Sequence, residues 1–354
     1  MLVLNGSSAD CTNERASPFY DGIKSVRKRR GGGGGGRRAV LSNANVRFLR
    51  SLGLAVNTTF GHNDEIRILI QQQDLYTLPC DSFLYVEGRL YDDGPGATTS
   101  EATDAQRQYA KLVNNCVAFM FDEIRYEIRY ELDGVEIDRY RNVGITSTIK
   151  NYASLTAERA RKLQNAGWSY PTNESNLNNA SRQFSFCVPL NILLGFCEDY
   201  KRVQLEKPRY VIFALQTGRR NEFTEDSSRF DHCALANVKL YLNSEFYPYD
   251  DVNPDFESDK FAVLYEMYAK FRGAYYGDSR DDALFSPREF ARVAPLVVID
   301  CSRQNKAVKS ATVDVRIEFE CKENVPPKTT AFCLIVHDRV IEYGPLTNVV
   351  RKII

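Results

Sequence analysis

The stretch of residues 122–140, DEIRYEIRYELDGVEIDRY, constrains the fold of this chain more than any other segment. Apolar and charged residues alternate in it without error from Ile124 to Leu132, as the two-residue side-chain period of a half-buried strand requires. Asp133 and Gly134 then accept the positive φ of a tight turn, after which the alternation resumes. The stretch therefore predicts a β-hairpin within an antiparallel body, and it contains nothing that indicates a reaction centre.

Similar strand patterns occur along the rest of the chain, with turn-forming residues between them. The candidate strands cover residues 65–71, 82–90, 116–132, 135–140, 184–188, 210–216, 238–242, 296–300, 311–321 and 331–343. Helix patterns are fewer. Residues 156–165 form one of them, and residues 260–277 form another, in which a largely aromatic stripe falls at helical spacing before Gly277. A short third segment opens at Ser286 with a capping box and ends before Pro295. The chain is therefore predicted to be all-β, with a few short helices in the connections.

Length and composition exclude several classes of protein. A chain of 354 residues has room for two domains. Lys and Arg total 46, and Asp and Glu also total 46, so no net field draws the whole protein onto nucleic acid or a membrane surface. The apolar runs are too short to cross a bilayer. Nine cysteines without a CxxC pair, and a start without the features of a signal peptide, indicate a reduced intracellular protein rather than a secreted one.

Residues 1–45 differ in composition from the rest, and they are predicted to form a disordered, basic and glycine-rich leader. A run of six glycines separates two groups of basic residues, which are Arg27, Lys28, Arg29, Arg30, Arg37 and Arg38. One interpretation is a flexible arm that neutralises nucleic-acid phosphates or serves as a nuclear address. The other is a low-complexity leader, or an engineered or wrongly assigned start, without a function of its own.

The residues that usually carry chemistry are few and scattered. The three histidines, His62, His232 and His337, occur in unrelated contexts, whereas metal or triad chemistry would need them to converge. His232 adjoins Cys233, but neighbours on a strand point to opposite faces, so a structural histidine is predicted rather than a thiolate–imidazole couple. Acidic pairs in the loops fit solvated turns better than a cation site. No catalytic residue, metal or cofactor is therefore predicted.

Several blocks of the sequence together resemble one family. They read GHNDEIRILIQQQDLYTLP, LVNNCVAFMFDEIRYE, RNVGITSTIKNY, FSFCVPLNILLGFCEDYKR, KPRYVIFALQTGR, ANVKLYLNSEFYPYDD and PLVVIDCSRQ. These blocks look like the double jelly-roll-like domain proteins found in multiple copies in invertebrate genomes, and the resemblance spans residues 57–354. That family is similar to the major capsid proteins of polinton-like and adintovirus-like DNA elements.

The resemblance implies a structural role. In such capsid proteins two jelly rolls stand side by side and trimers tile an icosahedral shell. The resemblance therefore implies a homotrimer that assembles further into a capsid, with a penton-type capsid protein as a second partner. It also implies a location in the virion or inside the host cell. It implies no catalytic residue in this chain. On this basis residues 46–203 are predicted to form the first jelly-roll-like domain and residues 204–354 the second.

The chain departs from the family pattern in two places. The family has a further β-rich block between the EDYKR and EKPRY segments, whereas here these segments almost adjoin. Because two jelly rolls need about sixteen strands, and ten candidates are found, strands are predicted to be missing from one roll. In addition, residues 123–126 are repeated as residues 127–130, an even insertion that keeps each side chain on its own face. Both features fit a degenerate endogenous copy or a gene model that lacks an exon.

Three hypotheses about function follow. The first is a structural, viral-type capsid protein or an endogenous descendant of one. The second is a non-catalytic host jelly-roll module that presents loops such as residues 91–103 to a carbohydrate or a protein, and it predicts a monomer or dimer. The third is a cupin-like enzyme with His62 or His232 at a barrel mouth, and the small number of histidines counts against it.

Overall fold

The computed structural model describes most of the chain after residue 82 and several shorter segments before it. The described residues are 2–6, 39–49, 58–60, 65–68, 82–92, 112–130, 133–170, 183–195, 208–219, 225–243, 245–277, 283–303, 315–337, 340–344 and 349–353. The six basic residues between positions 27 and 38, and most of the predicted loop at residues 91–103, lie outside these ranges.

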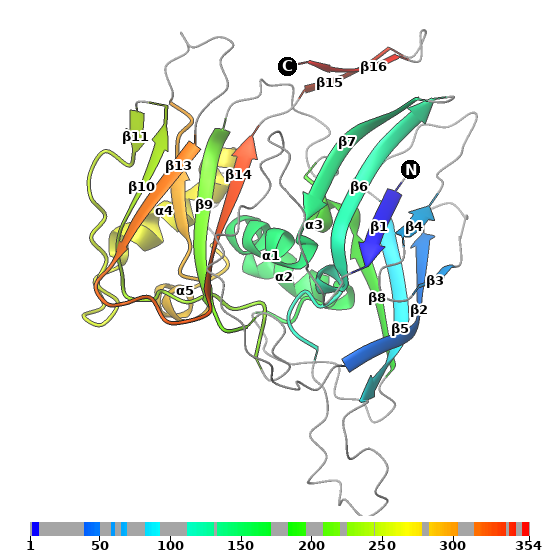
Figure 1. Ribbon diagram of the computed structural model, residues 1–354, viewed down its shortest axis with the longest axis horizontal. Coiled ribbons are helices and arrows are strands. Elements are labelled where there is room, and N and C mark those ends of the chain that lie inside the picture. The colour runs from blue at the N-terminus through cyan, green and yellow to red at the C-terminus, as the bar shows by residue number, and fades with distance from the viewer. Residues whose placement is uncertain are drawn as a thin grey trace, which may run out of the picture.

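Two four-stranded antiparallel sheets occupy the N-terminal part of the described chain. The first has the order β4-β1-β6-β7, with strands β1 (Leu2–Gly6), β4 (Glu65–Ile68), β6 (Phe121–Tyr130) and β7 (Asp133–Arg141). The second has the order β3-β2-β5-β8, with strands β2 (Ala39–Leu49), β3 (Thr58–Phe60), β5 (Phe83–Asp92) and β8 (Gln183–Pro189). We call these eight strands the first β group, which lies on the right in Figure 1.

Two three-stranded antiparallel sheets form the second β group, on the left in Figure 1. Their orders in the described chain are β11-β10-β13 and β12-β9-β14. The strands are β9 (Pro208–Thr217), β10 (Leu235–Leu242), β11 (Glu245–Tyr247), β12 (Val297–Asp300), β13 (Val315–Cys321) and β14 (Thr329–His337). A last hairpin pairs β15 (Val340–Gly344) with β16 (Val349–Ile353). Within the described residues the second group is the smaller one.

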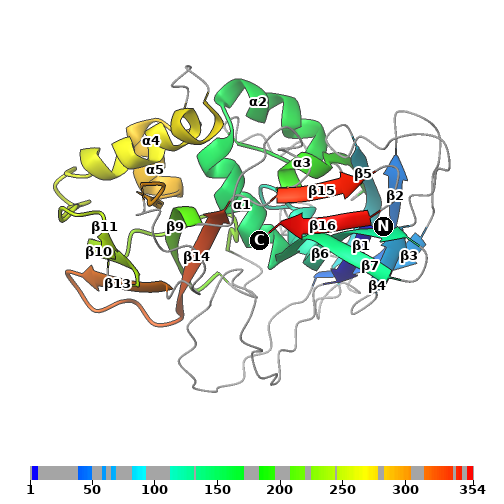
Figure 2. The same cartoon turned by 90° about the horizontal axis from the view of Figure 1, so that it is seen from above.

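Helices form a larger part of the fold than the sequence predicts. They are α1 (Val143–Ser154), α2 (Ala157–Lys162), α3 (Leu190–Leu193), α4 (Ala262–Tyr276) and α5 (Pro287–Val293), with 3-10 turns η2 (Ala118–Met120) and η3 (Leu163–Ala166). Figure 1 shows α1 and α2 between the two β groups, and Figure 2 shows the helices gathered along one side of both. The all-β prediction is therefore corrected to a mostly β fold with a helical side. Among the described residues no helix has the length and apolar character needed to cross a bilayer.

Helix α1 is the longest helix that the sequence patterns do not predict. Its sequence, VGITSTIKNYAS, is rich in β-branched residues, which favour strands when they are considered locally. Ten of its twelve residues are buried, so no polar stripe alternates with an apolar one to produce a helical period. Tertiary packing on nearly every side, rather than local preference, stabilises this helix.

The helices that the sequence predicts have the expected ends. Helix α4 ends at Gly277, which adopts a left-handed φ of 68°. Helix α5 begins after Ser286, whose backbone N–H donates to Glu289 Oε2 at 3.0 Å and completes a capping box. Helix α2 begins after Thr156, whose Oγ1 accepts a hydrogen bond from the backbone N–H of Arg159 at 3.1 Å. The structure therefore confirms the three predicted helices, and each one has the end signal that its sequence contains.

The predicted hairpin is present as β6 and β7, but its turn precedes Asp133. Asp133 pairs with Tyr130 and Gly134 pairs with Arg129, so both predicted turn residues belong to β7. At the other end of β6, Ile124 is fully buried. The pairing of β6 with β7 shifts by one residue between Tyr126 and Glu127, so the register at Ile124 does not continue to the turn. The position predicted for the turn is therefore wrong, while the hairpin itself is confirmed.

Strand β1 and the start of strand β2 lie within residues 1–45, where the sequence predicts a disordered leader. Strand β1 pairs with β4 on one side and β6 on the other. Strand β2 likewise pairs with both β3 and β5. The expectation of disorder is therefore wrong for these two segments, because neighbouring strands supply the backbone hydrogen-bond partners that an isolated segment lacks.

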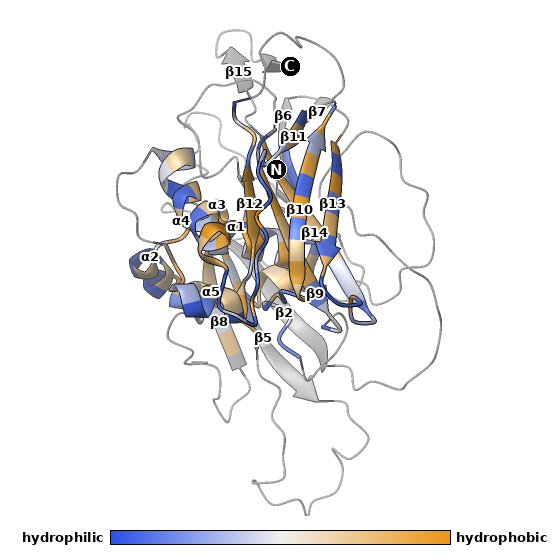
Figure 3. Cartoon of the chain, turned by 90° about the vertical axis from the view of Figure 1, so that its left-hand side faces the viewer, coloured by the Kyte–Doolittle hydropathy of each residue, from blue (hydrophilic) through white to orange (hydrophobic). Residues whose placement is uncertain are grey.

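Strand β9 is the centre of the second β group and is covered on both faces. On one face, Tyr210 lies against Phe271 of α4, with ring centroids 4.9 Å apart. On the other, Phe213 lies against Phe319 of β13, with ring centroids 5.1 Å apart. Figure 3 shows the resulting layers: helices, then β12 and its sheet, then β10 and β13. This two-sided burial explains why β9 is a nearly continuous apolar run rather than an alternating one.

Candidate functional site

Helix α1 links the two β groups through hydrogen bonds to helices on either side of it. The hydroxyl of Tyr268, in α4, donates to Tyr152 O at 3.0 Å. Lys150 Nζ donates to Asn191 O, in α3, at 2.8 Å. Two further hydrogen bonds repeat these links, from Arg272 Nε to Ser154 O at 3.2 Å and from Asn151 Nδ2 to Ile192 O at 3.0 Å. Because α4 packs on β12 and α3 follows β8 directly, α1 holds the two β groups together.

Tyr152 is the centre of an aromatic cluster at this junction. Its ring meets three others edge-on, with centroid distances of 5.4 Å to Trp168, 6.4 Å to Phe230 and 4.9 Å to Phe285. These partners come from both halves of the chain, and each of the four residues is at most 1% exposed. Edge-to-face contacts of this kind add to the free energy of burial. The cluster, named here the Tyr152 junction, therefore contributes directly to holding the two groups in place.

The Tyr152 hydroxyl has a hydrogen-bond partner, whereas the buried Nε1 of Trp168 has none, and neither group shows a sign of acid–base function. Asn114 Nδ2 donates to the Tyr152 hydroxyl at 3.1 Å. Burial raises the pKa of Tyr152 to about 12 and raises the pKa of Tyr268 as well. Both phenols are therefore neutral near physiological pH. Their role at this position is packing and hydrogen bonding.

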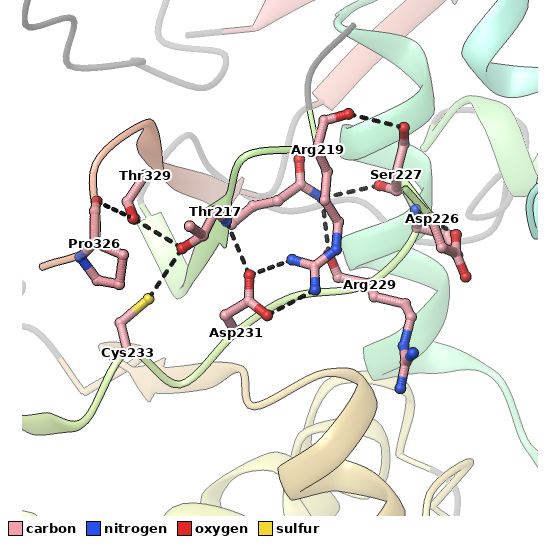
Figure 4. A network of polar contacts seen from close by, with 11 residues as sticks. Thr217, Arg219, Asp226, Ser227, Arg229, Asp231, Cys233, Pro326 and Thr329 are labelled. Carbon is pink, nitrogen blue, oxygen red and sulfur yellow. Dashed lines mark hydrogen bonds and ion pairs between the residues drawn. The ribbon is translucent and has the colours of Figure 1, made fainter. Parts of the chain in front are cut away.

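A second polar site lies where the chain returns to the end of β9 (Figure 4). Arg219 forms a two-pronged ion pair with Asp231, in which Nη2 donates to Oδ1 at 2.8 Å and Nη1 donates to Oδ2. Asp231 Oδ2 also accepts a hydrogen bond from the backbone N–H of Thr217 at 2.9 Å. The side chains of Arg219 and Asp231 are only 15% and 29% exposed. This arrangement, the Asp231 clamp, fixes the returning chain against β9.

The Asp231 clamp continues to the start of β14 through hydroxyl groups. Thr217 Oγ1 and Thr329 Oγ1 are 2.8 Å apart, and Thr329 Oγ1 donates to Pro326 O at 2.7 Å. Cys233 Sγ lies 3.5 Å from Thr217 Oγ1. Figure 4 shows Asp231 and Cys233 from one segment, and Thr329 from another, converging on Thr217. The clamp thus joins β9, the connection after it and β14, as a structural network does.

We expect Asp231→Asn to lower the free energy of unfolding by about 2 kcal/mol, because it removes the charge that holds Arg219 while keeping the shape. Urea denaturation of both proteins measures the difference. The matched control is Glu266→Gln in an exposed ion pair on α4, in which the side chain of Glu266 is 57% exposed and that of Lys270 is 71% exposed. The control should change stability by less than about 0.5 kcal/mol. Equal losses in the two variants would contradict a structural role for the clamp.

The predicted structural role of His232 is confirmed. Its ring stacks on Phe256, with centroids 4.6 Å apart, and its Nδ1 accepts a hydrogen bond from the backbone N–H of Ala234 at 3.1 Å. Cys233 instead faces Thr217, so the two neighbours form no thiolate–imidazole couple. The reason differs from the predicted one, because Cys233 adopts a φ of 46° in a turn rather than lying on a strand.

Four of the six described cysteine thiols are poor nucleophiles near neutral pH. Burial raises the pKa of Cys116 to about 12, and it also raises the pKa values of Cys187, Cys233 and Cys321. Since the thiolate is the reactive form, these thiols stay protonated and behave as packing groups. Cys301 illustrates this role, because it is fully buried and its Sγ donates to Pro208 O at 3.3 Å.

The other residues considered from the sequence are not brought together. His337 lies at the exposed end of β14, and Asp250 and Asp251 lie in an exposed turn after β11. Among the residues that the structure describes, no group of three or more His, Cys, Asp and Glu side chains could hold a metal ion. His62 and the six basic residues Arg27, Lys28, Arg29, Arg30, Arg37 and Arg38 lie outside the described residues.

Sequence reasoning did not identify the Asp231 clamp or Tyr152. Arg219 and Asp231 are twelve residues apart and match no motif, and only the return of the chain to β9 brings them together. Tyr152 belongs to a helix that local patterns do not reveal. Tyr268, by contrast, belongs to the aromatic stripe that predicts α4, and this stripe is the one sequence signal that could have located the junction.

One family model matches this chain. Its description is double jelly roll-like domain, and it matches residues 110–205 and residues 203–341. Together the two matches span more than half of the 354 residues, and they include both the Tyr152 junction and the Asp231 clamp. The comparison with curated proteins and the comparison with solved structures each find no match.

Proposed function

This chain belongs to the double jelly roll-like domain family, and on that premise we propose that it is a structural capsid-type protein that assembles into trimers. The observation that carries the proposal is the Tyr152 junction, in which α1 is bonded to helices of both β groups. A subunit that builds a shell must keep its two β units in one orientation, since assembly repeats that orientation in every copy. A buried aromatic junction supports such rigidity.

The chemistry of the described side chains supports the same proposal. Asp231 is held in an ion pair, His232 stacks on Phe256, and the thiol of Cys116 stays protonated. These groups contribute to packing rather than forming a convergent reactive site. The function of this protein would then be to assemble, and the free energy of assembly would come from the surfaces that the copies bury against one another.

We expect the purified chain to form a trimer with three times the chain mass of 40.3 kDa. Size-exclusion chromatography with light scattering measures this mass, and negative-stain microscopy of the same peak tests for pseudo-hexagonal particles. A dilution series provides the control, because a specific trimer dissociates at a defined concentration whereas irregular aggregate does not.

The other outcomes separate the competing hypotheses. A stable monomer would contradict the capsid proposal and favour the non-catalytic host module that binds a carbohydrate or a protein. Large irregular aggregate would instead favour a degenerate copy with exposed strand edges. One bound metal ion per chain in the purified protein would support the hypothesis of a cupin-like enzyme.

Three finer points belong to the same proposal. A penton-type capsid protein would be a second partner at the vertices of the shell. The protein would occur in the virion or inside the host cell. The six basic residues between positions 27 and 38 would contact nucleic acid.

A further inference from the structure

The outward face of the β11-β10-β13 sheet and the turn after β11 carry aromatic side chains, of which Phe246 and Tyr249 are exposed to solvent in the folded monomer. Phe246 is 40% exposed and Tyr249 is 68% exposed. Their ring centroids are 6.0 Å apart, and Phe246 also lies 6.2 Å from Tyr241 on the neighbouring strand. Tyr247 fixes the chain between them, because it is buried and its hydroxyl donates to Glu245 Oε2 at 2.7 Å. We call Tyr241, Phe246 and Tyr249 the aromatic ridge.

A lysine in β10 holds the aromatic ridge in place by bonding to the segment that follows β11. Lys239 Nζ donates to Pro248 O at 2.9 Å and to Tyr249 O at 3.2 Å, and it pairs with Asp251 at 2.9 Å. The same ammonium lies 5.2 Å from the ring centroid of Phe246. These contacts fix the backbone that carries the exposed rings. Exposed aromatic groups on a rigid support are typical of the energetically dominant residues of protein interfaces.

The shape of the aromatic ridge favours a protein partner over a sugar or a nucleic acid base. The planes of Phe246 and Tyr249 cross at 66°, and those of Tyr241 and Phe246 cross at 46°. A flat ligand therefore cannot stack on two of these rings at once. Side chains of another protein can fill the spaces between such tilted rings, as they do at well-packed interfaces.

The charge around the aromatic ridge favours a basic partner. The exposed carboxylates on this face or in the turn beside it are Asp250, Asp251, Glu318 and Glu320. Lys239 pairs with Asp251 and Arg316 pairs with Glu318, so the net negative charge comes from Asp250 and Glu320. A negative surface repels nucleic-acid phosphates and attracts a positive protein surface. Helix α2 provides such a surface within this same chain, because Arg159, Arg161 and Lys162 are exposed there and only Glu158 opposes them.

We propose that the aromatic ridge of one copy docks against the basic face of α2 on a second copy. This inference rests on the proposed function, because it names the surfaces through which the trimer forms. The contact joins two unlike surfaces, and a head-to-tail contact of that kind forms a three-membered ring when each copy is rotated by one third of a turn from the last. The ridge lies in the C-terminal family match and α2 in the N-terminal one, so each copy presents both surfaces.

The first test is the trimer dissociation constant of Tyr249→Ala, measured by light scattering over a dilution series. We expect the dissociation constant to rise at least tenfold, because truncation removes an aromatic group from the interface. The control is Val263→Ala, which shortens another exposed apolar side chain, 60% exposed, on α4. It should leave the constant unchanged. Circular dichroism of both variants verifies that each remains folded.

The second test exchanges charges between the two surfaces. Arg161→Glu should weaken the trimer, and adding Asp250→Arg to the same chain should restore most of the loss, since the two opposite charges meet again. A wild-type chain that never trimerises would contradict the proposed function itself. A wild-type trimer that Tyr249→Ala and Arg161→Glu leave unchanged would overturn only this inference. Binding of neutral oligosaccharides that depends on Tyr249, without any change in mass, would overturn it as well.

Discussion

Replacing Tyr152 with alanine should destabilise the protein by about 4 kcal/mol, because it leaves a cavity where a fully buried ring meets three others. The substitution also removes the acceptor of Asn114 Nδ2, which is itself buried. Thermal and urea unfolding both measure the loss. Since the cluster includes residues from both halves of the chain, we also expect separate transitions for the two β groups in place of a single one.

Two further variants show whether the ring or its hydroxyl accounts for the loss. Tyr152→Phe keeps the ring and should cost only about 1–2 kcal/mol, the typical effect of leaving one buried donor without an acceptor. Tyr249→Ala makes the same truncation at a side chain that is 68% exposed, and it should hardly change the stability of the monomer. If Tyr152→Ala and Tyr249→Ala unfold at the same urea concentration, the junction does not stabilise the fold.

The second large effect is expected at the centre of β9. Ile212 is fully buried, and it pairs with Val298 of β12 and Leu334 of β14. Ile212→Asp places a carboxylate in this apolar layer without a partner, which should cost more than about 4 kcal/mol. We therefore expect the variant to be unfolded or insoluble at room temperature, as measured by circular dichroism and by the soluble fraction after expression.

The control for this variant is Val263→Asp, which makes a comparable change from a β-branched residue to a carboxylate. Val263 is 60% exposed and lies in the first turn of α4, where an acidic side chain interacts favourably with the helix dipole. We expect its stability to stay within about 0.5 kcal/mol of the wild type. A folded Ile212→Asp would mean that β9 is not the buried centre of the second β group.

The dispersed sequence blocks were sufficient to predict the domain family of this chain. The blocks indicate a double jelly-roll-like protein across residues 57–354, and the family model confirms that type of domain for residues 110–341. The relation to capsid proteins of particular DNA elements stays a proposal. Blocks such as KPRYVIFALQTGR were informative because buried strands restrict the sequence strongly, since both faces of β9 are packed.

Local chemistry by itself determined the elements whose signals need no distant partner. The hairpin of β6 and β7 follows from strict alternation of side chains, helix α4 from its aromatic stripe and Gly277, and helix α5 from the capping box of Ser286 and Glu289. Each of these signals acts over a few neighbouring residues. For that reason the sequence was sufficient to predict them.

Tertiary structure alone decided the features that depend on contacts between distant segments. Helix α1 is helical because it is buried on nearly every side, and β1 is ordered because β4 and β6 flank it. The turn of the hairpin moved because the pairing of β6 with β7 shifts by one residue between Tyr126 and Glu127. Arg219 meets Asp231 only because the chain returns to β9. Burial and pairing of this kind depend on the whole fold, so local sequence patterns could not predict them.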